Sequence, residues 1–191
     1  MRQILMILSC HLIIGCTHYT LTQSECEHAD WFRIGVEDGI SGHSKDRAQR
    51  HEVACERFSI GVDKIIYNKG HDQGVVTFCN PQNGYRVGIR GDEYQYVCPK
   101  DSEPAFLAEY KKGYQIYSVK SEYSEMKWRM RHVLNELGDQ RTKLLQVKTS
   151  EERFRLVSNI NDLEQEKETL TQRMRLFEIQ NAQILTQVEA E

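Results

Sequence analysis

Residues 67–74, YNKGHDQG, place an aromatic residue three positions before a glycine and a second glycine four positions later. The same pattern occurs in residues 32–39, FRIGVEDG. Positions i, i+3 and i+7 of an α-helix lie on one face, so each segment predicts a helix with an aromatic–glycine–glycine stripe. A glycine inside a helix costs about 1 kcal/mol relative to alanine. The compensation that we expect is close contact between helices.

Shorter versions of the pattern occur in residues 85–88, YRVG, and 110–113, YKKG. We expect an aromatic ring of one helix to lie over the glycine stripe of its neighbour. The predicted helix-packing residues are Phe32, Gly35, Gly39, Tyr67, Gly70, Gly74, Gly88 and Gly113. Glycine-rich segments can also cradle phosphate, but such a loop follows a strand and opens a helix. No strand-like segment precedes Gly35 or Gly70, so packing is the favoured interpretation.

Side chains that can cap a helix N-terminus precede three predicted helices. They are Asp30 before residues 31–41, Ser44 before residues 45–58 and Asp63 before residues 64–78. Residues 80–84, NPQNG, predict a turn, and residues 85–92 fit either a short helix or a loop. Strand signals are scarce, so we predict an all-α fold.

Heptad-like spacing of apolar residues begins at Tyr123 and continues to Val147, and a second run covers residues 160–188. The two heptad frames do not match across residues 148–153, which allows a hairpin or one long helix with a phase shift. Thr149 and Glu152 have the spacing of a capping box, as expected where a second helix begins.

Lys167 and Asn181 fall at core positions of the second heptad run. Polar residues there cost stability but can fix register and oligomeric state. We therefore predict a coiled-coil-like helical tail over residues 118–191, which associates with a second copy or with an envelope partner.

The N-terminus has the pattern of a signal peptide. Arg2 precedes an apolar segment that is too short to span a bilayer, which takes about 20 apolar residues, but that fits a signal peptide. Residues 13–16, IIGC, resemble the lipobox of bacterial lipoproteins. The resemblance implies cleavage before Cys16 and acylation of that cysteine. Thr17 stands where an aspartate would resemble an inner-membrane retention signal, so we expect the outer membrane, facing the periplasm. The alternative is a buried N-terminal strand.

The predicted organisation has four parts. They are a signal peptide at 1–15, a linker at 16–23, a Cys- and Gly-rich helical domain at 24–117 and the tail at 118–191. Four cysteines remain beyond the signal peptide and the acylation site, and an even number in an oxidising compartment predicts disulfides. Of three possible pairings we favour Cys26–Cys55 with Cys79–Cys98, because sequential pairs close the shorter loops.

A zinc site is the competing interpretation of the first cysteines. Two thiols and two imidazoles, a possible tetrahedral set, come from Cys26, His28, His51 and Cys55. The spacing from Cys26 to His28 is not that of a usual zinc knuckle, and the predicted periplasm favours oxidation. We expect no metal and no cofactor.

Charge and motifs exclude several functions. The net charge of −3 argues against nucleic acid as a partner, because phosphate binding needs clustered Lys and Arg. No familiar catalytic motif occurs. Glu37 and Asp38 are adjacent and point in different directions on a helix, while His43, His51 and His71 are scattered. The tyrosines from Tyr85 to Tyr117 fit a sugar- or peptide-binding surface, but a core role is favoured.

The order of these motifs resembles a known family. The motifs are Asp30-Trp31, Gly35, Glu37-Asp38-Gly39, the Cys55 helix, Tyr67-x-x-Gly70-x-x-x-Gly74, Asn83-Gly84, Cys98-Pro99 and Tyr110-x-x-Gly113. Over residues 16–117 this is similar to uncharacterised proteobacterial lipoproteins that share a domain of unknown function. The resemblance implies location and architecture and no activity.

We therefore expect a non-catalytic structural or interaction lipoprotein, anchored to the membrane through Cys16. Two alternatives remain open. One is an envelope enzyme, or an accessory of a peptidoglycan enzyme, with a site around Glu37, Asp38 and the tyrosines. The other is a zinc-binding module.

Overall fold

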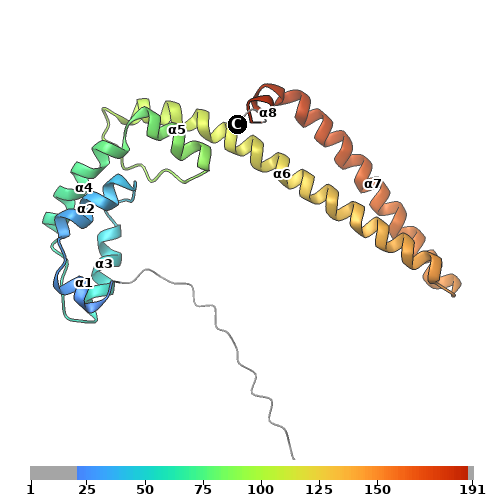
Figure 1. Cartoon of the computed structure of the whole chain (residues 1–191), viewed down its shortest axis with the longest axis horizontal. Helices are drawn as coiled ribbons and strands as arrows, with labels where there is room; N and C mark the ends of the chain where they lie inside the picture. The colour runs from blue at the N-terminus through green and yellow to red at the C-terminus, as the bar shows by residue number, and fades with distance from the viewer. Residues whose placement is uncertain (1–20, 189–191) are drawn as a thin grey trace, which may run out of the picture.

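The computed structural model describes residues 21–188, and within them the chain forms eight α-helices and no strand (Figure 1). The helices are α1 Gln23–Glu27, α2 Trp31–Ile40, α3 Arg47–Glu56, α4 Lys64–Phe78, α5 Pro81–Arg90, α6 Glu103–Gln146, α7 Ser150–Gln180 and α8 Ala182–Val188. The predicted all-α class is confirmed. The predicted signal peptide and Cys16 lie outside the described residues.

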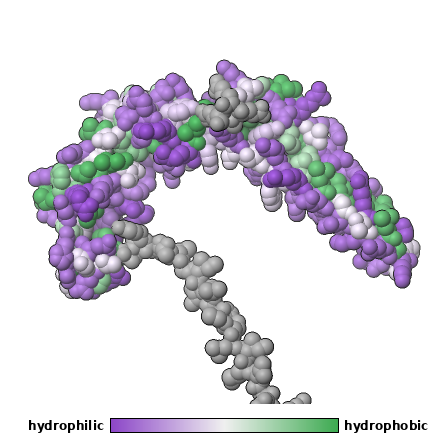
Figure 2. Space-filling model, in the orientation of Figure 1, coloured by the Kyte–Doolittle hydropathy of each residue, from purple (hydrophilic) through white to green (hydrophobic). Residues whose placement is uncertain are grey.

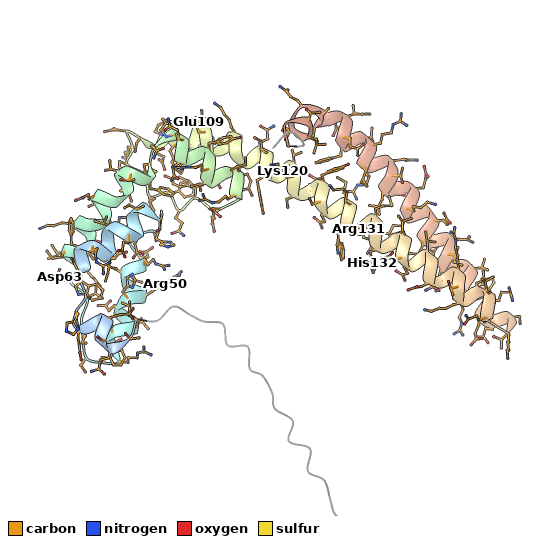
Figure 3. All side chains as sticks on the ribbon, in the orientation of Figure 1. Arg50, Asp63, Glu109, Lys120, Arg131 and His132 are labelled. Carbon is orange, nitrogen blue, oxygen red and sulfur yellow. A yellow bond between two sulfur atoms is a disulfide. The ribbon has the colours of Figure 1, made fainter. Side chains whose placement is uncertain are left out.

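Figure 1 shows these helices as an arch, with α1 to α5 in one arm and α7 beside the distal part of α6 in the other. Helix α6 belongs to both arms. In Figure 3, Glu109 marks the part of α6 that packs on α5, and Arg131 and His132 mark the part that runs in the hairpin. The predicted domain boundary at residues 117 and 118 lies inside this continuous helix. No helix of the described residues has both the length and the apolar character of a membrane span.

Glycines bring α2 against α4 at backbone distance. A Cβ atom added to Gly35 would lie 2.1 Å from the carbonyl oxygen of Tyr67, and one added to Gly70 would lie 2.0 Å from that of Phe32. Gly39 and Gly74 extend the contact, since a Cβ on either would lie 3.0 Å from the Cα of the other. No residue larger than glycine fits such a crossing, which confirms the predicted packing role of the stripes.

The same contact joins α5 to α6. A Cβ on Gly88 would lie 2.2 Å from the carbonyl oxygen of Tyr110, and a Cβ on Gly113 would lie 2.3 Å from that of Tyr85. In both helix pairs, the residue three positions before a glycine gives its carbonyl to the glycine of the partner helix. The nearest atoms to an added Cβ at these glycines are backbone atoms of the partner helix, where we expected an aromatic ring. The Phe32 side chain is 38% exposed, and its backbone makes the contact.

The two helix pairs also agree at their ends. Gly42 after α2 and Gly91 after α5 both have φ of 74°, a left-handed conformation that favours glycine. A Cβ at either would lie 2.3 Å from a ring of the second helix of its pair, from Phe78 in the first and from Tyr117 in the second. We call α2 with α4 the first pair and α5 with α6 the second pair.

The disulfides join Cys26 to Cys55 and Cys79 to Cys98, with Cα–Cα distances of 5.6 and 5.5 Å. This is the pairing favoured from the sequence. Each bond links a residue that shortly precedes the first helix of a pair to the segment that connects the two helices of that pair. In the first pair this segment contains α3, and in the second it is a loop. The disulfides therefore repeat along the chain together with the glycine contacts.

Two helix starts differ from the sequence prediction. Residues 80–84 are not a turn. The Asn80 side chain accepts a hydrogen bond from the Asn83 backbone at 2.8 Å and Pro81 is the first residue of α5, where proline is well tolerated. Ser44 does not cap α3, which begins at Arg47 with no side-chain capping bond. The N-caps of α2 and α4 are confirmed at Asp30 and Asp63.

Helices α6 and α7 form an antiparallel hairpin, so of the two open arrangements the structure has the hairpin. Its core contains Val133, Leu137 and Leu170. Thr149 accepts a hydrogen bond from the Glu152 backbone at 3.3 Å at the start of α7, as predicted. Asn181 is not a core residue of a continuing helix, because it ends α7.

Candidate functional site

The carboxylate of Asp38 lies at the crossing of α2 and α4, where the residue is 8% exposed. Its Oδ2 atom accepts a hydrogen bond from the Tyr67 hydroxyl at 2.8 Å and one from His51 Nε2 at 2.8 Å. Its Oδ1 atom accepts a hydrogen bond from Arg47 Nε at 3.1 Å. We call these four residues the Asp38 cluster. An ionised carboxylate only accepts hydrogen bonds, so His51 Nε2 carries a proton here.

Burial and hydrogen bonding act in opposite directions on Asp38. Burial raises its pKa, but the hydrogen bonds from His51 and Tyr67, together with electrostatic interactions with His51 and Arg47, outweigh burial, and the pKa is lowered from its ordinary value. Burial, and the hydrogen bond to Asp38, raise the pKa of Tyr67. The cluster therefore holds an ionised carboxylate against a neutral tyrosine.

The cluster connects α3 to the first pair. Asp38 precedes the packing residue Gly39 on α2, and Tyr67 is fully buried on α4. Arg47 and His51 are four residues apart on α3 and so share a face. The cluster and the Cys26–Cys55 bond together fix α3 across the crossing. The buried Asp38 carboxylate thus accepts hydrogen bonds from three side chains. A buried charge needs such partners, because burial removes its hydration.

His71 is a second buried histidine beside the cluster. It is 2% exposed, and its Nε2 atom lies 2.6 Å from the carbonyl oxygen of His43. Its Nδ1 atom has no hydrogen-bond partner. The second pair has the same bond at the same place, because the Tyr110 hydroxyl donates to the carbonyl oxygen of Asp92 at 3.0 Å. We infer that His71 holds the turn after α2, as Tyr110 holds the turn after α5.

A family model matches residues 30–115, under the description "Protein of unknown function (DUF2799)". These residues form a DUF2799 domain. The match begins at the N-cap of α2, ends within α6, and includes both glycine-packed pairs and the Asp38 cluster. Neither a curated protein nor a solved structure matches the chain.

The DUF2799 domain does not bring the predicted acidic residues together. Glu37 lies on the surface, where it forms an ion pair with Arg33 at 2.5 Å, while Asp38 is buried. The tyrosines also separate. Tyr94 is buried and donates a hydrogen bond to Glu103 at 2.9 Å, and burial raises its pKa to about 12. Tyr96 is 78% exposed. The predicted core role is therefore confirmed for Tyr94, which is buried, and wrong for Tyr96, which is exposed.

The zinc alternative is wrong for this arrangement. Cys26 and Cys55 are joined in a disulfide, so neither sulfur is a free thiolate. His51 bonds Asp38, and His28 Nδ1 lies 3.0 Å from the carbonyl oxygen of Ser24. Across the described part of the chain, no three His, Cys, Asp or Glu side chains are grouped so that they could share a metal ion.

Sequence reasoning missed the Asp38 cluster because its members come from three helices. His51 and Tyr67 lie 13 and 29 positions after Asp38, and no motif links such distances. One signal was present. The glycine stripes predict which faces of α2 and α4 meet, and Asp38 and Tyr67 lie beside those stripes.

Proposed function

We propose that this protein is an outer-membrane lipoprotein that faces the periplasm and is anchored through acylated Cys16. The DUF2799 domain acts as a rigid base. The α6–α7 hairpin is an interaction arm that binds a second copy or an envelope partner. The module is non-catalytic.

Two features support the envelope location. The four residues ending at Cys16 have the form of a lipobox, behind a segment with the form of a signal peptide. One disulfide lies within the DUF2799 domain, and a second joins Cys26, just before the domain, to Cys55 inside it. Disulfides persist in oxidising compartments such as the periplasm.

The observation that carries the interaction role is the number of large apolar side chains that the hairpin leaves exposed. They include Trp128 at 58%, Leu134 at 49%, Leu176 at 59% and Ile179 at 66% exposure. Exposed apolar patches rimmed by polar residues mark interaction sites, and Figure 2 shows hydrophobic residues along the hairpin among hydrophilic ones. These side chains give the hairpin arm an apolar surface on which another helix or protein can pack.

The Asp38 cluster supports a non-catalytic role. All three partners of its carboxylate belong to the fold, and Asp38 itself is buried. A catalytic carboxylate needs access to a substrate within hydrogen-bond reach. The burial of Asp38 therefore favours the non-catalytic proposal over the enzyme alternative at Glu37 and Asp38.

The anchor is tested by the intact mass of the protein purified from its own membranes, before and after reduction. We expect the mass of residues 16–191 plus acyl groups, with a gain of four hydrogens on reduction, two for each disulfide. A full-length, unacylated mass would contradict the anchor.

The interaction role is tested by cross-linking in the cell with a photoreactive residue in place of Trp128, and in place of exposed Tyr96 as the control. We expect a cross-linked species of defined mass from position 128 and none from position 96. No product from either position would contradict a binding role for the hairpin.

A further inference from the structure

We propose that the far end of the hairpin docks on an anionic phospholipid surface and gives the protein a second membrane contact. We call this end, residues 141–157, the hairpin tip. The proposal rests on the proposed lipid anchor for its geometry. Its chemistry comes from the tip itself.

The tip is basic in an acidic protein. It has two acidic residues, Glu151 and Glu152, against five basic residues, which gives +3 for the tip compared with −3 for the whole chain. The basic residues are Arg141, Lys143, Lys148, Arg153 and Arg155. Arg141 and Arg155 form ion pairs with Glu164 and Glu151. Among residues 21–188, Lys143 and Lys148 have no ion-pair partner, so both remain available to bind headgroups.

The tip also carries exposed apolar side chains. Leu145, in the last turn of α6, is 87% exposed, the highest value among the exposed large hydrophobic residues of the described chain. Phe154, near the start of α7, is 77% exposed. Figure 2 shows hydrophobic residues among hydrophilic ones along the hairpin as far as its end. Apolar side chains among basic ones are the pattern of a segment that lies in the membrane interface.

The shape of the molecule brings the tip toward the membrane. In Figure 1, α1 is at one end of the arch and the turn between α6 and α7 is at the other, and both ends are directed to the same side of the molecule. Cys16 precedes Leu21 by five residues, a reach of at most about 18 Å. An anchor at Cys16 therefore keeps the α1 end close to the bilayer. The tip, on the same side of the arch, is then able to reach that bilayer.

Charge favours lipid over a second copy as the occupant. Two tips that met would each bring +3, and like charges repel at short range. An anionic leaflet instead attracts Lys and Arg near its surface, by about fivefold in affinity for each such residue.

The test separates the tip from the anchor. It uses the mature chain, residues 16–191, with Cys16→Ser, so that no acyl group contributes to binding. Its probes are vesicles of phosphatidylcholine with phosphatidylglycerol, and vesicles of phosphatidylcholine alone. We expect sedimentation with the anionic vesicles only, and weaker binding as salt concentration rises.

Variants of this chain assign the binding to the tip. We expect Lys143→Gln with Lys148→Gln to weaken binding to anionic vesicles more than tenfold, and Leu145→Glu with Phe154→Glu to weaken it at least as much. The matched control is Ile65→Glu with Val76→Glu, which adds the same charge to two exposed sites on α4, outside the hairpin, and we expect less than a twofold effect. Circular dichroism of each variant checks that the helices remain.

Three outcomes would overturn the proposal. They are no binding to either vesicle, equal binding to both, and an equal loss in the control variant. A fourth outcome, a dimer of the parent chain that the tip variants convert to monomer, would also overturn it, because it would assign the tip to self-association. Because the chain in this test is unacylated, failure of the anchor appears only in the intact mass, and failure of the tip only here.

Discussion

The first and second helix pairs have the same backbone contacts but different interiors. Asp38 precedes Gly39 in the first pair, and Val87 precedes Gly88 in the second. The fully buried Tyr67 and Phe106 also correspond, because their carbonyl oxygens would lie 2.1 and 2.4 Å from a Cβ added to Gly35 and Gly84, the glycines four positions earlier. Glycine against carbonyl sets the crossing in both pairs. Beneath the crossing, the first pair has a carboxylate that is hydrogen-bonded to a tyrosine. The second pair has two apolar side chains that belong to one hydrophobic core cluster.

The difference follows the connecting segment. In the first pair α3 supplies Arg47 and His51 to the Asp38 carboxylate, and the polar interior depends on those donors. In the second pair the connection is a loop, and an apolar core cluster contains Val87, Tyr94 and Phe106. The comparison teaches that glycine spacing determines how the helices cross, while the connecting segment determines whether a charge can be buried beneath them.

The largest effect is expected from alanine at the crossings. Gly35→Ala and Gly113→Ala each place a Cβ within 2.3 Å of a backbone carbonyl oxygen, which only a shift of the helices can relieve. We expect each to lower the free energy of unfolding by about 3 kcal/mol, the upper end of the usual cost of overpacking, measured by urea denaturation. The control is Gly138→Ala, a helical glycine with nothing within 4 Å of an added Cβ, which we expect to raise stability by up to about 1 kcal/mol. Equal effects at all three positions would contradict the packing role.

The disulfides come next. Replacing both cysteines of a bond by serine removes the cross-link. That cross-link joins residues 29 positions apart for Cys26–Cys55 and 19 positions apart for Cys79–Cys98. We expect a loss of about 3 kcal/mol in each case, also by denaturation. Hydrogen exchange distinguishes the two variants. Loss of Cys26–Cys55 should increase exchange in α3 and leave α5 protected, and a uniform increase would contradict separate roles for the two bonds.

A smaller effect is expected at Asp38. Asp38→Val gives the first pair the residue of the second and leaves donors from Arg47, His51 and Tyr67 without their acceptor. We expect a loss of about 2 kcal/mol and faster hydrogen exchange in α3. The control is Glu37→Val on the surface, with an expected change within about 0.5 kcal/mol. A similar loss in both variants would show that the cluster does not hold α3.

The smallest effect is that of pH. Because the pKa of Asp38 is lowered by folding, its ionised form stabilises the fold above the ordinary aspartate pKa of about 3.9. That stabilisation is lost as pH falls through the lower pKa of the folded state. Denaturation between neutral and acidic pH should therefore show a smaller acid-induced loss in Asp38→Val than in the parent chain. Parallel curves would contradict the assignment.

Much of this fold was predictable because the signals for helix starts and helix contacts lie within short stretches of sequence. Asp30 and Asp63 cap the next helix, and the glycine stripes are periodic within single helices, so short windows contain the information. Residues 80–84 were wrongly predicted to be a turn, because Asn-Pro also begins a helix when asparagine caps and proline takes the first position. The Asp38 cluster depends on how three helices meet, and no window of the sequence contains that.

The measurement that tests the comparison most directly is a double-mutant cycle on Asp38→Val and Tyr67→Phe. The double variant carries in the first pair the residue types found at the matching positions of the second. We predict that it loses less stability than the sum of the two single variants, by about 1 kcal/mol or more, and that both disulfides still form. Additive losses would mean that Asp38 and Tyr67 do not act as a unit, and would contradict the equivalence of the two pairs.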